Sequence, residues 1–281
     1  MRSLAASAVA LATCAIAVGM PASLEAKEPD AAPAAAKSSK AKVVAAAKPW
    51  CAPEVTELSD HVCFFDGGAP ADGRKTLVIY LHGALAMTPG FFYLQQRAMA
   101  FHAKRHGFTV LMPTGPSDGV GFVWPTGQAA QKDQEAGILA GIKKARTDLE
   151  KKVGHKFDET FVVGFSSGAY YGSSLAVRGA LDVDGYIVLA GGSSWVKGEN
   201  VAQKRAPVFV GVSAADPQTA GHSRSFAGSL GAMKWPFKVE ERNAGHMVDW
   251  TFMTHGITWL PERSPVKKSA SLVNVSTATA P

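Results

Sequence analysis

Short apolar runs and longer stretches with helical spacing alternate through the middle of the chain. Residues 76–83 form a continuous apolar run that ends in a loop, as buried parallel strands do. Residues 89–107 follow with helical spacing and close on a glycine, which is a helix-stop signal. The clearest predicted helix covers 129–154, where apolar residues from Ile138 to Leu149 recur at three- and four-residue steps.

The alternation continues to about residue 260. We predict further strands at 108–116, 160–165, 184–192, 207–216 and 237–243, and further helices at 167–178, 219–231 and 247–260. Strands that alternate with helices predict an α/β fold with a mostly parallel central sheet and helices on both faces. Ligands of such sheets bind beyond the carboxyl ends of the strands, so polar residues at those ends are the candidate site residues.

Three such residues have complementary chemistry. Ser166, Asp216 and His246 each lie at or just beyond the carboxyl end of a predicted strand, in that chain order. A serine hydroxyl becomes a good nucleophile when a histidine removes its proton, and a carboxylate fixes the tautomer of that histidine and stabilises its cation. We therefore predict Ser166 as the nucleophile, His246 as the base and Asp216 as the acid.

The glycines around Ser166 fit this role. Gly164 and Gly168 complete a G-x-S-x-G pattern, in which a serine occupies a sharp turn from a strand into a helix. Glycine leaves room for the backbone on both sides of that turn. The N–H of Ser167 then lies at a helix N-terminus, where it can stabilise an oxyanion.

A second oxyanion donor is expected in the loop after strand 76–83. The N–H of Ala84 is the first choice and that of Leu85 the alternative. His82 is expected to orient this loop and not to move protons, because it follows a different strand from Ser166.

Other residues of the same types are weaker candidates because of their predicted places. Two histidines lie inside predicted helices, two aspartates precede a strand, and one aspartate lies on the helix side of His246. They are His222, His255, Asp182, Asp184 and Asp249.

Two tryptophans follow other predicted strands. Trp124 and Trp195 lie in loops that should overlook Ser166, where they would wall an acyl or alcohol pocket. The alternative is that each packs against its own loop.

The two ends of the chain differ from the middle. Residues 1–26 have the pattern of a secretory signal peptide, which predicts a secreted or periplasmic protein. A lipoprotein anchor at Cys14 is not favoured, because the cysteine comes early and follows a threonine. We predict that 27–48, rich in Ala, Lys and Pro, is a disordered tether and that 262–281 is a disordered tail.

The predicted catalytic domain, residues 49–261, is nearly neutral. It carries 20 Lys and Arg against 19 Asp and Glu, although the whole chain has a formal charge of +6. This balance does not favour nucleic acid as a partner. Weak attachment of the basic tether to an anionic cell surface is an additional expectation.

Removal of the leader would leave Cys51 and Cys63. An even pair in an exported chain predicts a disulfide, and two reduced buried thiols are the alternative. No Cys-x-x-Cys pair or Cys/His cluster has zinc spacing, so no metal is predicted.

Four segments, YLHGA, GFSSGAYY, VSAAD and NAGHMVDW, resemble in order and spacing the α/β-hydrolases. From about Thr76 to Leu260 the chain is similar to the secreted esterases grouped with polyhydroxybutyrate depolymerases and feruloyl esterases. It lacks the cysteine that often follows His-Gly in the depolymerase group, and no added polymer-binding domain is found.

This resemblance implies ester hydrolysis through an acyl-enzyme on Ser166, without a cofactor. Short acyl, aryl or feruloyl, and hydroxyalkanoate esters are the candidate substrates. An exported serine peptidase of the same fold and a catalytically idle surface-binding protein are the alternatives.

Overall fold

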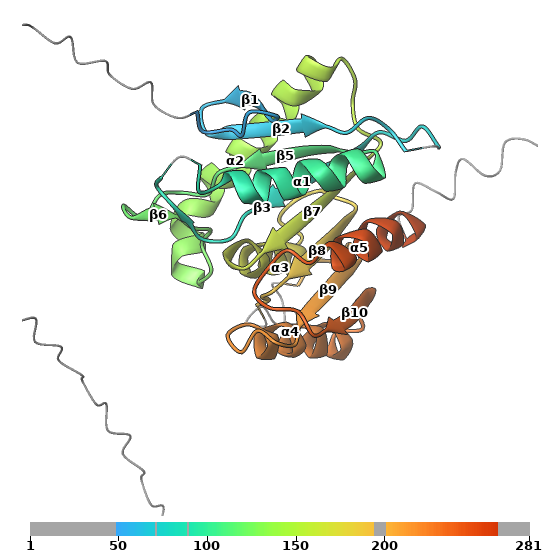
Figure 1. Ribbon diagram of the computed structural model, residues 1–281. Coiled ribbons are helices and arrows are strands. Elements are labelled where there is room, and N and C mark those ends of the chain that lie inside the picture. The colour runs from blue at the N-terminus through green and yellow to red at the C-terminus, as the bar shows by residue number, and fades with distance from the viewer. Residues whose placement is uncertain (1–48, 71, 89, 194–200, 264–281) are drawn as a thin grey trace, which may run out of the picture. The chain divides into compact units, whose positions relative to one another are not determined.

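Eight strands form the main sheet of the computed structural model, which describes residues 49–70, 72–88, 90–193 and 201–263 (Figure 1). From one edge to the other they are β1 (Thr56–Ser59), β2 (Val62–Asp66), β5 (Thr109–Pro113), β3 (Thr76–Leu81), β7 (Glu159–Phe165), β8 (Gly185–Leu189), β9 (Val208–Ser213) and β10 (Phe237–Arg242). Neighbours from β5 to β10 are parallel, whereas β2 is antiparallel to both β1 and β5. The predicted α/β fold with a mostly parallel sheet is confirmed.

Five helices of the described residues cover the two faces of this sheet. They are α1 (Tyr93–His106), α2 (Gln128–Val153), α3 (Ser167–Arg178), α4 (Ala220–Ala232) and α5 (Trp250–Arg263). Alternate residues of β3 show why both faces need cover: Leu77 and Ile79 pack with residues of α2, α3 and α4, whereas Val78 and Tyr80 pack with α1 and α5. Burying each large apolar side chain contributes about 1.5–3 kcal/mol.

The predicted elements between residues 76 and 260 all occur; five of the six predicted strands are shorter than expected, and β7 begins one residue earlier, at Glu159. The β1–β2 pair and a small second sheet of β4 (Leu85–Ala86) and β6 (Gly121–Phe122) were not predicted, because runs of two to five residues carry little periodicity. Helix α5 continues to Arg263, three residues past the predicted end of that helix and two residues into the predicted tail. The predicted signal peptide (1–26), the predicted tether (27–48), residues 264–281 and Trp195 lie outside the described residues. Among those described, no helix combines the length and apolar composition needed to cross a membrane.

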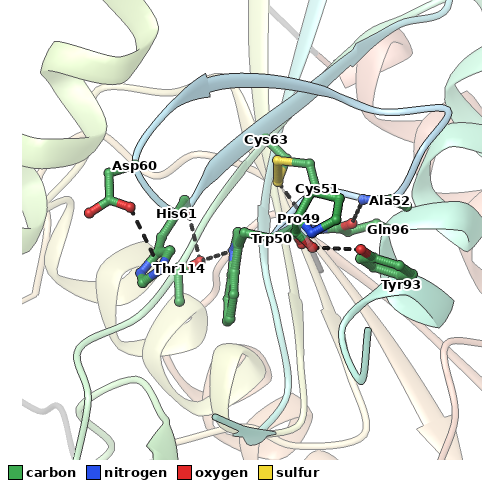
Figure 2. Close-up of a disulfide and its surroundings, with 10 residues drawn as sticks. All are labelled: Pro49, Trp50, Cys51, Ala52, Asp60, His61, Cys63, Tyr93, Gln96 and Thr114. Carbon is green, nitrogen blue, oxygen red and sulfur yellow. Dashed lines mark hydrogen bonds and ion pairs between the residues drawn. A yellow bond between two sulfur atoms is a disulfide. The ribbon is translucent and has the colours of Figure 1, made fainter. Parts of the chain in front are cut away.

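The predicted disulfide joins Cys51 to Cys63 of β2, with an S–S distance of 2.01 Å (Figure 2). The buried side chain of Gln96 on α1 secures the same segment: its Oε1 accepts a hydrogen bond from the Ala52 N–H at 2.6 Å, and its Nε2 lies 3.2 Å from the Cys63 sulfur. Next to Cys51, the ring of Trp50 packs on Phe92 and Phe122. The start of the described chain is therefore attached to α1, β2 and β6.

Candidate active site

Ser166 occupies the turn between β7 and α3 with φ 51° and ψ −117°, a conformation that non-glycine residues rarely adopt. The flanking glycines make room for this turn. A Cβ at Gly168 would lie 2.0 Å from the carbonyl oxygen of Leu81, and one at Gly164 would lie 2.3 Å from that of Gly168. The strained turn projects Ser166 beyond the carboxyl end of β7, as in a nucleophile elbow.

The structure brings Ser166, His246 and Asp216 into one hydrogen-bonded chain. His246 Nε2 lies 3.0 Å from Ser166 Oγ, and His246 Nδ1 lies 2.6 Å from Asp216 Oδ2. In the neutral imidazole, Nδ1 keeps its proton and donates a hydrogen bond to the carboxylate, so the lone pair of Nε2 is free to accept the serine proton. The arrangement can therefore activate Ser166 as a nucleophile.

Asp216 is held in place from several sides. Its side chain is buried, Thr219 donates a hydrogen bond to Oδ2, and the Gln218 N–H donates to Oδ1 at 3.0 Å. Burial by itself would raise the pKa of Asp216, but these hydrogen bonds and the one from His246 outweigh it and lower the pKa. Asp216 consequently stays ionised and can stabilise an imidazolium at His246.

Backbone hydrogen bonds join the segment after β9, which carries Asp216, to the segment at the end of β10, which leads to His246. The Ala214 N–H donates to the carbonyl of Arg242 at 2.8 Å, and the Ala215 N–H donates to that of Ala244 at 3.1 Å. Because β9 and β10 are parallel neighbours, both loops leave the same end of the sheet.

Two backbone segments are available to stabilise an oxyanion at Ser166. Ser167 is the first residue of α3, where an N–H has no acceptor within the helix. The loop after β3 lies against the nucleophile, because a Cβ at Gly83 would be 3.3 Å from the Cβ of Ser166. Of the two candidates for the second donor, Ala84 follows directly in this loop and Leu85 begins β4.

His82 braces that loop. Its Nδ1 lies 2.5 Å from the carbonyl oxygen of Gly83, and its Nε2 accepts a hydrogen bond from the Gly115 N–H at 2.8 Å. Burial lowers the pKa of His82 to about 4, although the bond to Gly83 works against this shift. His82 is therefore neutral at pH 7 and has the orienting contacts expected of it.

A cavity of about 460 Å³ adjoins Ser166 and includes Thr126 on its wall. The loop after β6, which carries both Trp124 and Thr126, therefore reaches the site as predicted. The residue that lines the cavity is Thr126. Trp124 itself is 2% exposed, and its ring stacks on Tyr171 and contacts His82. The expectation that Trp124 walls the pocket is corrected: its large apolar ring lies in the core between β3 and α3.

The structure places the five weaker candidates away from the proton path. His255 lies 2.6 Å from Glu240, and His222 contacts Tyr170. The carboxylates of Asp184 and Asp249 accept backbone N–H bonds at the starts of β7 and α5, and Asp182 pairs with Lys204.

Some residues around the site were not anticipated. Thr219 lies three residues after Asp216, and Tyr170 lies one helical turn after Ser166, so their sequence spacing could have indicated a shared face. Gln95, whose Oε1 accepts hydrogen bonds from the N–H of Gly83 and the hydroxyl of Tyr80, has no local signal.

Two further findings concern other candidate sites. In the part of the chain that the structure describes, no group of three or more His, Cys, Asp or Glu side chains is arranged to hold a metal ion.

A larger cavity of about 620 Å³ lies between α2 and residues 180–183, next to the amino ends of β7 and β8. It contains none of the three residues of the hydrogen-bonded chain.

The fold is known from other proteins, although no family model and no curated protein matches the chain. The structure of YahD with malic acid is 14% identical and covers 72% of this chain and 98% of its own, with a TM-score of 0.54. A carboxylesterase from Bacillus cereus is 15% identical; the match covers 72% of this chain and 93% of that protein, with a TM-score of 0.52. A carboxylesterase from Mesorhizobium loti is 18% identical; the match covers 74% of this chain and 99% of that protein, with a TM-score of 0.51. These likenesses and the sheet order show the α/β-hydrolase fold.

Proposed function

We propose that this protein is a serine esterase that hydrolyses carboxylic esters through an acyl-enzyme on Ser166. The observation that carries the proposal is the hydrogen-bonded chain from Ser166 through His246 to Asp216 beside an open cavity. Carboxylesterase is also the activity named for two of the solved proteins with this fold.

The first half of the reaction acylates the serine. Ser166 Oγ attacks the ester carbonyl carbon while His246 Nε2 takes the hydroxyl proton. The N–H of Ser167 and that of Ala84 stabilise the oxyanion of the tetrahedral intermediate. The intermediate collapses, the bond to the alcohol oxygen breaks, and His246 returns the proton to the leaving alcohol.

The second half frees the acid. Water gives a proton to His246 and attacks the acyl carbon, and the second tetrahedral intermediate expels Ser166, which takes the proton back. Asp216 stabilises the imidazolium in both halves. Short acyl, aryl and hydroxyalkanoate esters all suit this chemistry.

Hydrolysis of p-nitrophenyl esters from acetyl to dodecanoyl tests the proposal. Ser166→Ala should abolish turnover with the fold intact by circular dichroism, whereas Ser229→Ala on α4, outside the cavity, should match the parent. Equal activity in Ser166→Ala would refute the acyl-enzyme on this residue. Hydrolysis of peptides in place of esters would support a peptidase, and failure of a serine-directed phosphonate to label Ser166 would support an idle binding protein.

We further propose that the protein is exported. The Cys51–Cys63 disulfide supports this, because such bonds persist in oxidising compartments, and so does the leader-like sequence of residues 1–26. Expression of the whole chain in a bacterial host, followed by cell fractionation and N-terminal sequencing, tests it. A cytoplasmic product that still begins at residue 1 would contradict export.

A further inference from the structure

Most of the described residues around the cavity beside Ser166 carry a hydroxyl or an imidazole group. In addition to Ser166, the described residues that line it are Thr126, Ser167, Tyr170, Gly192, Ser193 and His222. None of these described residues has an aliphatic side chain. A hydrocarbon group bound here would make no hydrogen bond to these side chains, whereas an oxygen atom on the ligand could.

The position of the cavity suggests which part of an ester it would bind. Its described lining includes the oxyanion donor Ser167 but not His246. The leaving alcohol has to lie next to His246 Nε2 to receive its proton. A cavity on the oxyanion side of Ser166 is therefore suited to the acyl group that stays on the serine.

Tyr170 and His222 form a hydrogen-bonded pair in the lining of this cavity. The Tyr170 hydroxyl contacts His222 Nδ1, and the two rings cross at 71° with their centroids 5.6 Å apart. Tyr170 comes from α3 and His222 from the first turn of α4. Burial, followed by the charge of Asp216, raises the pKa of Tyr170, so its hydroxyl keeps its proton at neutral pH.

The pair offers both kinds of hydrogen-bonding group. When Tyr170 donates to Nδ1 of a neutral His222, the imidazole proton is on Nε2, which can donate to a ligand. The tyrosine oxygen keeps lone pairs that can accept. Ser166 and Tyr170 line the same cavity and are one helical turn apart in sequence, so a group on the acyl chain that stays on Ser166 can approach the pair.

We propose that Tyr170 and His222 are specificity-determining residues that select acyl groups with an oxygen atom beyond the ester carbonyl, such as a keto or hydroxyl oxygen, over alkyl groups of the same size. This inference rests on the proposed esterase function and deepens it. The acyl oxygen binds at the pair while Ser166, His246 and Asp216 carry out the reaction unchanged.

Two esters of similar shape test the inference. p-Nitrophenyl 4-oxopentanoate carries a keto oxygen where p-nitrophenyl 4-methylpentanoate carries a methyl group. The measurement is the ratio of kcat/KM for the two esters, each value divided by the rate of hydroxide-catalysed hydrolysis of the same ester. The parent protein should prefer the oxo ester, and Tyr170→Phe or His222→Ala should each lower the ratio by about fivefold, which corresponds to one hydrogen bond.

Tyr93→Phe is the matched control, because Tyr93 lies on α1, outside the cavity lining, and its hydroxyl donates to the carbonyl of Pro49. Its ratio should equal that of the parent. A parent ratio of one or less, or a ratio unchanged in both cavity variants, would overturn the subsite and leave the esterase proposal standing. Absence of Ser166-dependent hydrolysis of both esters would overturn the proposed function and this inference with it.

Discussion

Gln95 holds the backbone of Gly83: its side-chain Oε1 lies 3.2 Å from the Gly83 nitrogen and 2.7 Å from the hydroxyl of buried Tyr80. The side-chain oxygen of this α1 residue thus joins the end of β3 to the loop that should supply the second oxyanion donor.

Replacement of Gln95 by Leu should therefore affect catalysis and stability together. The freed loop should lower kcat by about tenfold, less than outright loss of an oxyanion donor, with little change in KM. The Tyr80 hydroxyl would lose its acceptor, at a cost of about 1–3 kcal/mol. Gln95→Glu keeps an acceptor at the same position and should rescue kcat. Steady-state kinetics on a p-nitrophenyl ester and urea unfolding measure both effects, and an unaltered kcat in Gln95→Leu would contradict the bracing role.

Asp216→Asn should remove most of the activity while preserving the fold. An amide in place of the carboxylate favours the wrong tautomer of His246 and cannot stabilise its cation, so kcat should fall by about 10³- to 10⁴-fold. Single-turnover measurement of acylation would locate the loss in the chemical step. Asp249→Asn, which changes an aspartate that caps α5, is the matched control and should lose far less activity. Similar losses in the two variants would speak against Asp216 as the acid.

Replacement of a glycine by alanine should have opposite effects on stability at two positions of α3, Gly168 and Gly172. A Cβ at Gly168 would meet the Leu81 carbonyl at 2.0 Å, whereas the nearest atom to one at Gly172 would be Cδ1 of Leu81, at an ordinary 3.6 Å. Gly168→Ala should destabilise the protein by about 3 kcal/mol or more, or prevent folding. Gly172→Ala should be neutral or stabilising by up to about 1 kcal/mol, because alanine favours a helix interior. Thermal unfolding distinguishes the pair, and equal stabilities would contradict the described packing.

Stability should fall as the solution is acidified, because two histidines are buried. The pKa of His82 and that of His102 are each lowered to about 4, in both cases mainly by burial. Since the unfolded chain binds these protons near pH 6.5, stability is lost as pH falls from about 6.5 to about 4, by up to about 3 kcal/mol per histidine. Below pH 4 this contribution is constant.

His102→Leu isolates one of these groups. The ring is 2% exposed, and its Nδ1 has no hydrogen-bond partner among the described residues. The variant should show a shallower decline of unfolding free energy between pH 6.5 and 4 in urea titrations. His155→Leu is the matched control, because this histidine lies after α2, away from His102, with Nδ1 3.1 Å from the carbonyl oxygen of Lys156, and the variant should keep the parent slope. Identical slopes for the parent and His102→Leu would refute the assignment.

The disulfide should stabilise the fold through the segment that it anchors. Closing the short loop between Cys51 and Cys63 contributes about 3 kcal/mol in the chain-entropy model. Reduction with dithiothreitol should lower Tm in the parent and leave a Cys51→Ser, Cys63→Ser double variant unaffected. If reduction leaves the Tm of the parent unchanged, the disulfide carries no such stability.

The alternation of apolar runs and helical stretches was enough to predict the α/β architecture, because a strand buried on both faces is an uninterrupted local signal. It also placed Ser166, Asp216 and His246 at strand ends, and the pattern of Gly164 and Gly168 identified the sharp turn. These inferences depend only on neighbouring residues. The edge hairpin β1–β2 escaped prediction because its few residues carry little pattern.

Contacts between distant segments were decided by the tertiary structure alone. Asp216 and His246 meet because β9 and β10 are adjacent and parallel, and the order of strands is not written in any one of them. Whether an aromatic side chain faces a cavity or the core depends on what packs around it, so Trp124 could be assigned to the right loop but given the wrong direction. For the same reason, the bracing of Gly83 by Gln95 became visible only once α1 was packed against β3.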